Sequence, residues 1–117
     1  MIKSRLESVC RALPGATEEI LWGNDLVFKV GGKMFFATDA SEDPAACFSF
    51  KVADERFLEL TDLPGVRPAP YLARARWVQI DPRACKLDHD DLEQLVEHSY
   101  QLVFAKLSRK LRQSIRH

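Results

Sequence analysis

The sequence predicts an α+β fold of two layers, in which helices pack on one face of an antiparallel sheet. Strand-like runs cluster between residues 20 and 52 and return at 76–80, while helical periodicity marks both ends of the chain. A Gly-Gly link joins two of the runs as a hairpin, and no alternation of strands with helices suggests a parallel sheet. The 117 residues, of which 46% are hydrophobic, fit a single domain, 1–117, with a core of its own.

The N-terminal part of the chain predicts a helix over residues 2–13. Apolar residues recur on one face of it: Ile2, Leu6, Val9 and Leu13. Pro14 and Gly15 end this pattern, and a short apolar run at 20–22 is a strand candidate.

The middle of the chain predicts three further strands. Residues 26–30 and 33–38 flank Gly31-Gly32, which favours a tight antiparallel hairpin. Residues 46–52 follow a polar loop, and Phe48 and Phe50 share one face of that strand.

The C-terminal half predicts two helices and one strand. A helix of about two turns begins at Asp54 and is stopped by Leu63-Pro64-Gly65. Because Pro68 and Pro70 remove backbone donors, residues 66–72 are expected to be an extended linker outside the sheet. Residues 76–80 form the last strand, and a helix runs from Asp88 to Lys106 or beyond.

The charges and cysteines indicate which partners and compartment to expect. The 17 basic and 17 acidic residues cancel, so an attraction to nucleic acid must be local. The last residues are basic without an acid among them: Lys106, Arg109, Lys110, Arg112 and Arg116. Cys10, Cys47 and Cys85 are widely spaced, which favours free thiols in a reducing cytoplasm. We expect a cytoplasmic monomer with no membrane-spanning segment.

Catalytic and metal motifs are incomplete. Gly31-Gly32-Lys33 lacks the spacing of a phosphate-binding loop, and His89 and His98 are not at a spacing that shares a helical face. Ser99-Tyr100 has no nucleophile elbow around it, and Tyr100 is expected to pack on the sheet with its hydroxyl bonded. We therefore expect no enzymatic activity, no cofactor and no metal.

Several short motifs, in their order along the chain, carry a family resemblance. They are Cys10-x-x-Leu13-Pro14-Gly15-Ala16, the segment 27–35, Phe50-Lys51-Val52, Pro70-Tyr71, Trp77-Val78 and Ser99-Tyr100-x-Leu102-Val103-x-x-Lys106-Leu107. In these the chain resembles the MmcQ/YjbR family of small bacterial proteins. The resemblance implies a two-layer α+β fold similar to secretion chaperones. It also implies a "double wing" module that is predicted to bind DNA, and it supplies no catalytic residues.

Basic and aromatic residues in or beside the strands form the candidate nucleic-acid site. In a strand Lys29 points opposite to Phe28, and Arg76 points opposite to Trp77, so the bases are expected on an open face of the sheet. Basic groups among aromatic rings suit recognition by phosphate contact and stacking. The candidate residues are Lys29, Lys33, Lys51, Tyr71, Arg74, Arg76 and Trp77.

Two other hypotheses remain open from the sequence. One is a protein-interaction or chaperone-like module, which the neutral net charge and the implied fold favour. The other is a small-ligand binder or enzyme with a pocket near Trp22, Tyr71 and Trp77, where two prolines make the entrance rigid. The expected partner is accordingly DNA, another protein or a small molecule.

Overall fold

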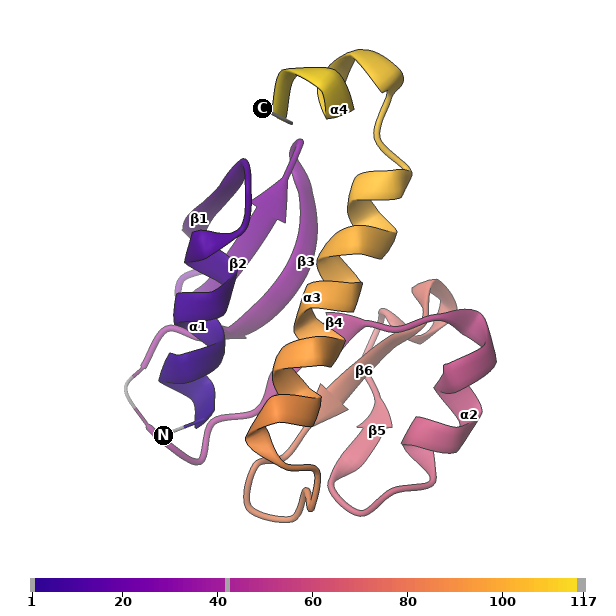
Figure 1. The fold of residues 1–117 in the computed structure, drawn as a ribbon. Helices are drawn as coiled ribbons and strands as arrows, with labels where there is room; N and C mark the ends of the chain where they lie inside the picture. Colours follow the sequence, from indigo (N-terminus) through magenta and orange to yellow (C-terminus); the bar gives the residue numbers. More distant parts are fainter. Residues whose placement is uncertain (1, 42, 116–117) are drawn as a thin grey trace.

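The computed structural model describes residues 2–41 and 43–115, which form one six-stranded antiparallel sheet covered by helices (Figure 1). The strand order in the sheet is β1-β2-β3-β4-β6-β5. The strands are β1 (Ala16–Leu21), β2 (Asp25–Val30), β3 (Lys33–Asp39), β4 (Phe48–Lys51), β5 (Val66–Pro68) and β6 (Trp77–Ile80). The helices are α1 (Ile2–Ala12), α2 (Asp54–Thr61), α3 (His89–Ala105) and α4 (Arg109–Ile115), with a 3-10 turn η1 (Ala73–Ala75). The predicted α+β class is confirmed.

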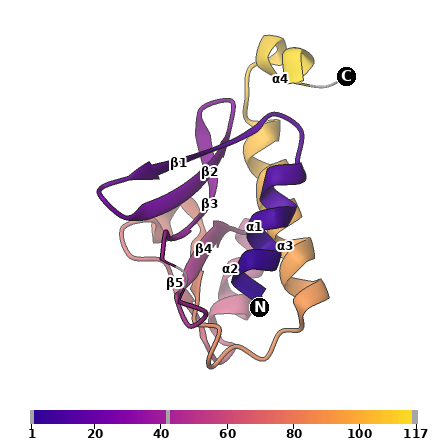
Figure 2. The ribbon, with the colours of Figure 1, turned by 90° about the vertical axis from the view of Figure 1, so that its left-hand side faces the viewer.

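Two helices form the second layer. Helices α1 and α3 lie side by side over one face of the sheet, which Figure 2 shows edge on, while α2 packs against β5 and β6. Asp88 caps α3, since its carboxylate accepts the Asp91 N–H at 2.8 Å. None of the helices in the described ranges is long and apolar enough to cross a membrane.

The core lies between the sheet and this helical layer. Phenylalanine rings from neighbouring strands contact one another along it. Phe28 and Phe36 meet edge to face with ring centroids 6.0 Å apart, and Phe36 and Phe48 stack with centroids 5.9 Å apart. Tyr100 of α3 packs edge-on against Phe35, and its hydroxyl donates to the Pro14 carbonyl oxygen at 2.6 Å. The prediction for Tyr100 is thereby confirmed.

The Gly-Gly hairpin is also as predicted. Gly31 and Gly32 have φ angles of 57° and 81°, the left-handed pair that a two-residue hairpin turn requires. A Cβ at Gly31 would lie 2.8 Å from a methyl carbon of Leu107, so the turn also packs closely below the end of α3. Both reasons favour glycine there.

Residues 66–72 differ from the prediction, because part of this segment is a strand. β5 pairs with β6 at the edge of the sheet, and Pro68 lies opposite Val78. A proline is tolerated at a sheet edge, where its missing N–H leaves no neighbouring strand unpaired. The expectation that the prolines would keep the whole segment out of the sheet was wrong.

Other element boundaries also moved. The first strand is longer than predicted and ends before Trp22, whose φ is 49°. The last strand starts at Trp77, because Arg76 is the left-handed cap of η1 with a φ of 63°. The C-terminal helical pattern is divided between α3 and the separate helix α4, and Arg116 lies outside the described residues.

Candidate functional site

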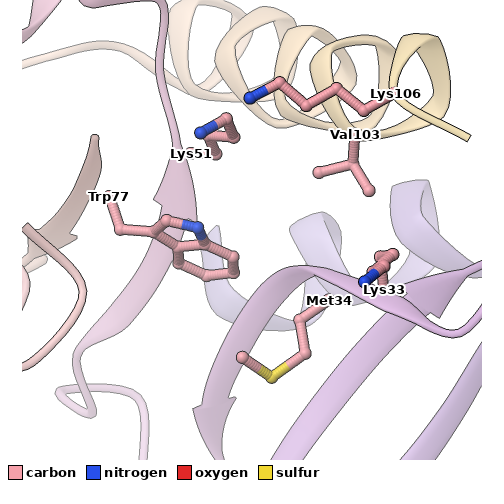
Figure 3. A pocket seen from close by; sticks show the side chains of 6 residues that line it. All are labelled: Lys33, Met34, Lys51, Trp77, Val103 and Lys106. Atoms are coloured by element: carbon pink, nitrogen blue, oxygen red, sulfur yellow. The ribbon is translucent and has the colours of Figure 1, made fainter. Parts of the chain in front are cut away.

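A pocket of about 380 Å³ opens where β3 and β4 separate. Its lining residues are Lys33, Met34, Lys51, Trp77, Val103 and Lys106. They come from β3, from the paired strands β4 and β6, and from the C-terminal end of α3. Three of the six are lysines and none is a carboxylate, so we call this site the lysine pocket (Figure 3).

Strand pairing brings the sheet residues of the lysine pocket together. Lys51 lies opposite Trp77 in the β4–β6 ladder, and both alternate with core residues, so they lie on the outer face, opposite α1 and α3. Met34 lies opposite Lys29 across a bulge that follows Phe28, which brings Met34 to the same outer face. Figure 3 shows the amino groups of Lys51 and Lys106 on one side of the Trp77 ring, with Met34 on the β3 side.

Ser99 of α3 fixes the gap between β3 and β4. The two strands pair only from Phe36–Phe50 to Thr38–Phe48, although β3 begins at Lys33. At the end of this ladder the Ser99 hydroxyl donates to the Phe35 carbonyl oxygen at 2.7 Å and accepts the Lys51 N–H at 3.0 Å. Because Ser99 is 0% exposed, its hydroxyl stands in for the missing ladder bonds and anchors the backbone of Lys51 beside α3.

Positive groups dominate the electrostatics of the lysine pocket. Burial lowers the pKa of Lys51, and the positive charges of Lys106 and Arg76 lower it further, while Asp54 acts in the opposite direction. The Lys51 ammonium donates to the carbonyl oxygen of Ala75, a neutral acceptor. An anion in the lysine pocket would therefore relieve repulsion among positive groups.

The structure brings together only some of the predicted site residues. Lys33, Lys51 and Trp77 line the lysine pocket. Trp77 is only 4% exposed, so its indole forms a wall and not an open stacking platform. Lys29 lies outside this lining and pairs with Glu19.

The remaining predicted residues lie around η1. The Arg76 guanidinium pairs with Asp54 at 3.2 Å and stands over the Phe57 ring at 5.3 Å. Arg74 is exposed, and Tyr71 is fully exposed with a φ of 66°. Neither Tyr71 nor Trp22 lines the lysine pocket, so this pocket contains only Trp77 of the three aromatic residues expected around a ligand site.

Three pocket residues were missed by the sequence analysis as site residues. They are Met34, Val103 and Lys106. Lys106 was noted as part of a basic C-terminal segment and, with Val103, as part of a family motif, but neither was assigned to a site. Its spacing of three from Val103 on a helical pattern was the available signal, because residues three apart share a helical face.

The outer face changes sign along the sheet. A second pocket of about 350 Å³ toward the other ends of β2 and β3 is lined in part by Asp25, Asp39 and Asp43. Hydrogen bonds from Ser41 hold the pKa of the Asp39 carboxyl below its usual range. Within residues 2–41 and 43–115, no group of three or more His, Cys, Asp or Glu could hold a metal ion. The basic part of the face is thus local.

Known proteins share this fold and a family domain. The model of the YjbR family matches residues 11–102. The crystal structure of the Deinococcus radiodurans protein DR2400, which has a DUF419 domain, superimposes with a TM-score of 0.82 at 30% identity, over 97% of this chain and 86% of that chain. A Pseudomonas syringae protein of known structure has the same fold, with a TM-score of 0.70 at 17% identity over 88% of this chain and 99% of that chain. No functionally curated protein matches the chain.

Proposed function

The chain belongs to the YjbR family, and we propose that it is a non-enzymatic DNA-binding module whose lysine pocket holds phosphate groups. The observation that carries the proposal is the convergence of Lys33, Lys51 and Lys106 from three elements, with no carboxylate among the lining residues. Cations gathered on one surface are what phosphate contact requires, and in a chain of zero net charge they must be gathered locally.

The chemistry of the lining supports binding without catalysis. Apart from the lysines, the lysine pocket is lined by Met34, Trp77 and Val103, which offer no carboxylate, imidazole, hydroxyl or thiol for acid–base work. The Lys51 ammonium is engaged as a donor to the Ala75 carbonyl oxygen. We place the module in the cytoplasm, a setting that its three free thiols suit.

Three lysines predict a modest affinity with a defined salt dependence. If each ammonium neutralises one phosphate of a duplex, the slope of log K against log salt is about −2.7, and the affinity falls about 40-fold between 50 and 200 mM salt. Titration of a labelled duplex by fluorescence anisotropy at several salt concentrations measures this slope.

Two charge-matched double variants decide whether the lysine pocket is responsible. Lys51→Gln/Lys106→Gln removes two pocket charges, while Lys86→Gln/Lys110→Gln removes two exposed lysines outside its lining. The proposal predicts that only the first pair lowers the affinity strongly and flattens the salt slope by about 2. Equal losses in both variants, or no duplex binding at low salt, would overturn it.

A second candidate, protein binding, is favoured by the edge of the sheet. β1 is an edge strand, and Ile20 is 60% and the adjoining Trp22 74% exposed. Exposed backbone and apolar side chains at an edge allow another strand to be added. Size-exclusion chromatography with light scattering tests self-association of this kind. If the chain is a monomer at every concentration, and Ile20→Lys leaves its elution and mass unchanged, copies of the chain do not pair through β1.

A further inference from the structure

We infer that the lysine pocket is a site for a terminal phosphomonoester, the group found at the 5′ end of a DNA strand or on a free nucleotide. The inference deepens the proposed function and rests on it for the lysine pocket as the contact surface. It adds that the lysine pocket prefers a terminal phosphate, so that the internal phosphodiesters of a duplex bind there more weakly.

The number and charge of the ammonium groups match a terminal phosphate. A phosphomonoester carries about −1.5 to −2 charge at neutral pH and presents three acceptor oxygens. Lys33, Lys51 and Lys106 can each supply a donor from a different wall of the lysine pocket. An internal phosphodiester has a smaller charge and fewer free oxygens, so it would leave part of this cluster uncompensated.

The shape of the site favours a chain end or a small molecule. The lysine pocket measures about 380 Å³, within the roughly 300–1,000 Å³ of small-molecule sites. It lies in the gap between β3 and β4, with Val103 of α3 in its lining. A phosphate in the middle of a duplex lies on a convex surface and has its neighbours on both sides. A terminal phosphate can enter a recess without that obstruction.

Apolar side chains complete the site beside the lysines. Met34, Trp77 and Val103 give it a wall that suits the carbon face of a sugar or the edge of a base. Because Trp77 is 4% exposed, only a small part of its ring can touch a ligand, and this does not suit a run of stacked bases. A single nucleotide with its phosphate therefore accounts for both parts of the lining.

Two nearby features oppose an anion, and both are weaker than the lysines. The C-terminal end of α3, which Lys106 caps, carries about half a negative charge. Asp54 acts on Lys51 but is itself paired with Arg76. Three full positive charges outweigh these contributions, and burial of Lys51 strengthens its attraction for an anion.

The test compares two short single-stranded oligonucleotides that differ only in a 5′-phosphate. Isothermal titration calorimetry measures their affinities for the full chain, with adenosine and its 5′-monophosphate as a second pair. We expect the phosphorylated member of each pair to bind at least about tenfold more tightly, which is about 1.4 kcal/mol. Lys51→Gln and Lys106→Gln should each abolish the difference, and Lys86→Gln, outside the pocket lining, should preserve it.

Each result decides the inference separately from the proposed function. Equal affinities within both pairs overturn the inference, while salt-dependent binding of the unphosphorylated strand would still support DNA binding. A phosphate preference that survives both pocket variants also overturns it, because the site then lies elsewhere. Phosphate-dependent binding of the mononucleotide without any DNA binding supports the inference and overturns the proposed function. Lys106 is exposed, so its variant remains informative even if Lys51→Gln does not fold.

Discussion

Replacing Ser99 with alanine should lower the free energy of unfolding by about 2 to 4 kcal/mol. The Ser99 side chain is 0% exposed, and its hydroxyl bonds the Phe35 carbonyl oxygen at 2.7 Å and the Lys51 N–H at 3.0 Å. Each buried backbone group that loses this partner costs about 1–3 kcal/mol. Two such losses cost about 2 to 6 kcal/mol, and alanine returns about 0.5 kcal/mol through its higher helix propensity, so the expected 2 to 4 kcal/mol lies within the resulting range of about 1.5 to 5.5 kcal/mol.

Thermal and urea denaturation followed by circular dichroism measure this loss. For a domain of this size about 4 °C accompanies each kcal/mol, so Ser99→Ala should melt about 8–16 °C lower. Ser49→Ala on the outer face is the matched control and should stay within about 0.5 kcal/mol of the parent. The phosphate affinity of Ser99→Ala should also fall, because the Lys51 backbone loses its anchor. A variant as stable as the parent would refute the bridging role of this hydroxyl.

Three further predictions concern the lysine pocket and two backbone positions. Phosphate affinity should begin to fall at a pH below the ordinary lysine pKa of about 10.4, because the lowered pKa of Lys51 makes it lose its proton before other lysines. Lys51→Arg should move this fall to higher pH in calorimetric titrations. Gly65→Ala should lower the free energy of unfolding, measured in urea, by about 2 to 4 kcal/mol, because φ at this position is 76° and the new Cβ would lie 2.7 Å from the Ala84 carbonyl carbon. Gly32→Ala is the control: its Cβ would meet no atom within 4 Å, so the free energy of unfolding should fall by only about 1 kcal/mol. Tyr71→Gly should raise the melting temperature, because glycine adopts the φ of 66° without strain and the fully exposed Tyr71 side chain contributes no packing. An unchanged or lower melting temperature would show that the backbone at Tyr71 is not strained.

Local patterns were enough to predict most of the elements. The Gly31-Gly32 link is sufficient to predict the hairpin between β2 and β3, because few residue types other than glycine adopt positive φ angles at two successive positions. Apolar periodicity located α1 and most of α3 for a similar reason, since it depends only on near neighbours. The same kind of signal was present at Ser108, whose hydroxyl accepts the Leu111 N–H and marks the start of α4, but the basic run around it was interpreted as one continuous helix.

Local sequence patterns could not predict the tertiary arrangement of the site. Lys51 meets Trp77 only because β4 pairs with β6, a choice that depends on the whole sheet. The strand character of β5 depends on its edge position, which makes Pro68 acceptable. Lys33 and Lys106 line the same pocket because α3 lies beside the point where β3 and β4 separate, where Ser99 bonds both strands. No local pattern around Ser99 indicates this contact.

Chemical-shift mapping tests the central claim, that the lysine pocket is the contact site, most directly. The ¹⁵N-labelled chain is titrated with the 5′-phosphorylated oligonucleotide, and backbone amide shifts are followed at each residue. The largest shifts are predicted at Met34, Lys51, Trp77 and Lys106, with Ile20 and Asp39 at the far end of the sheet unchanged. Shifts centred on β1, or shifts that leave the lysine pocket unaffected while the oligonucleotide binds, would contradict the account.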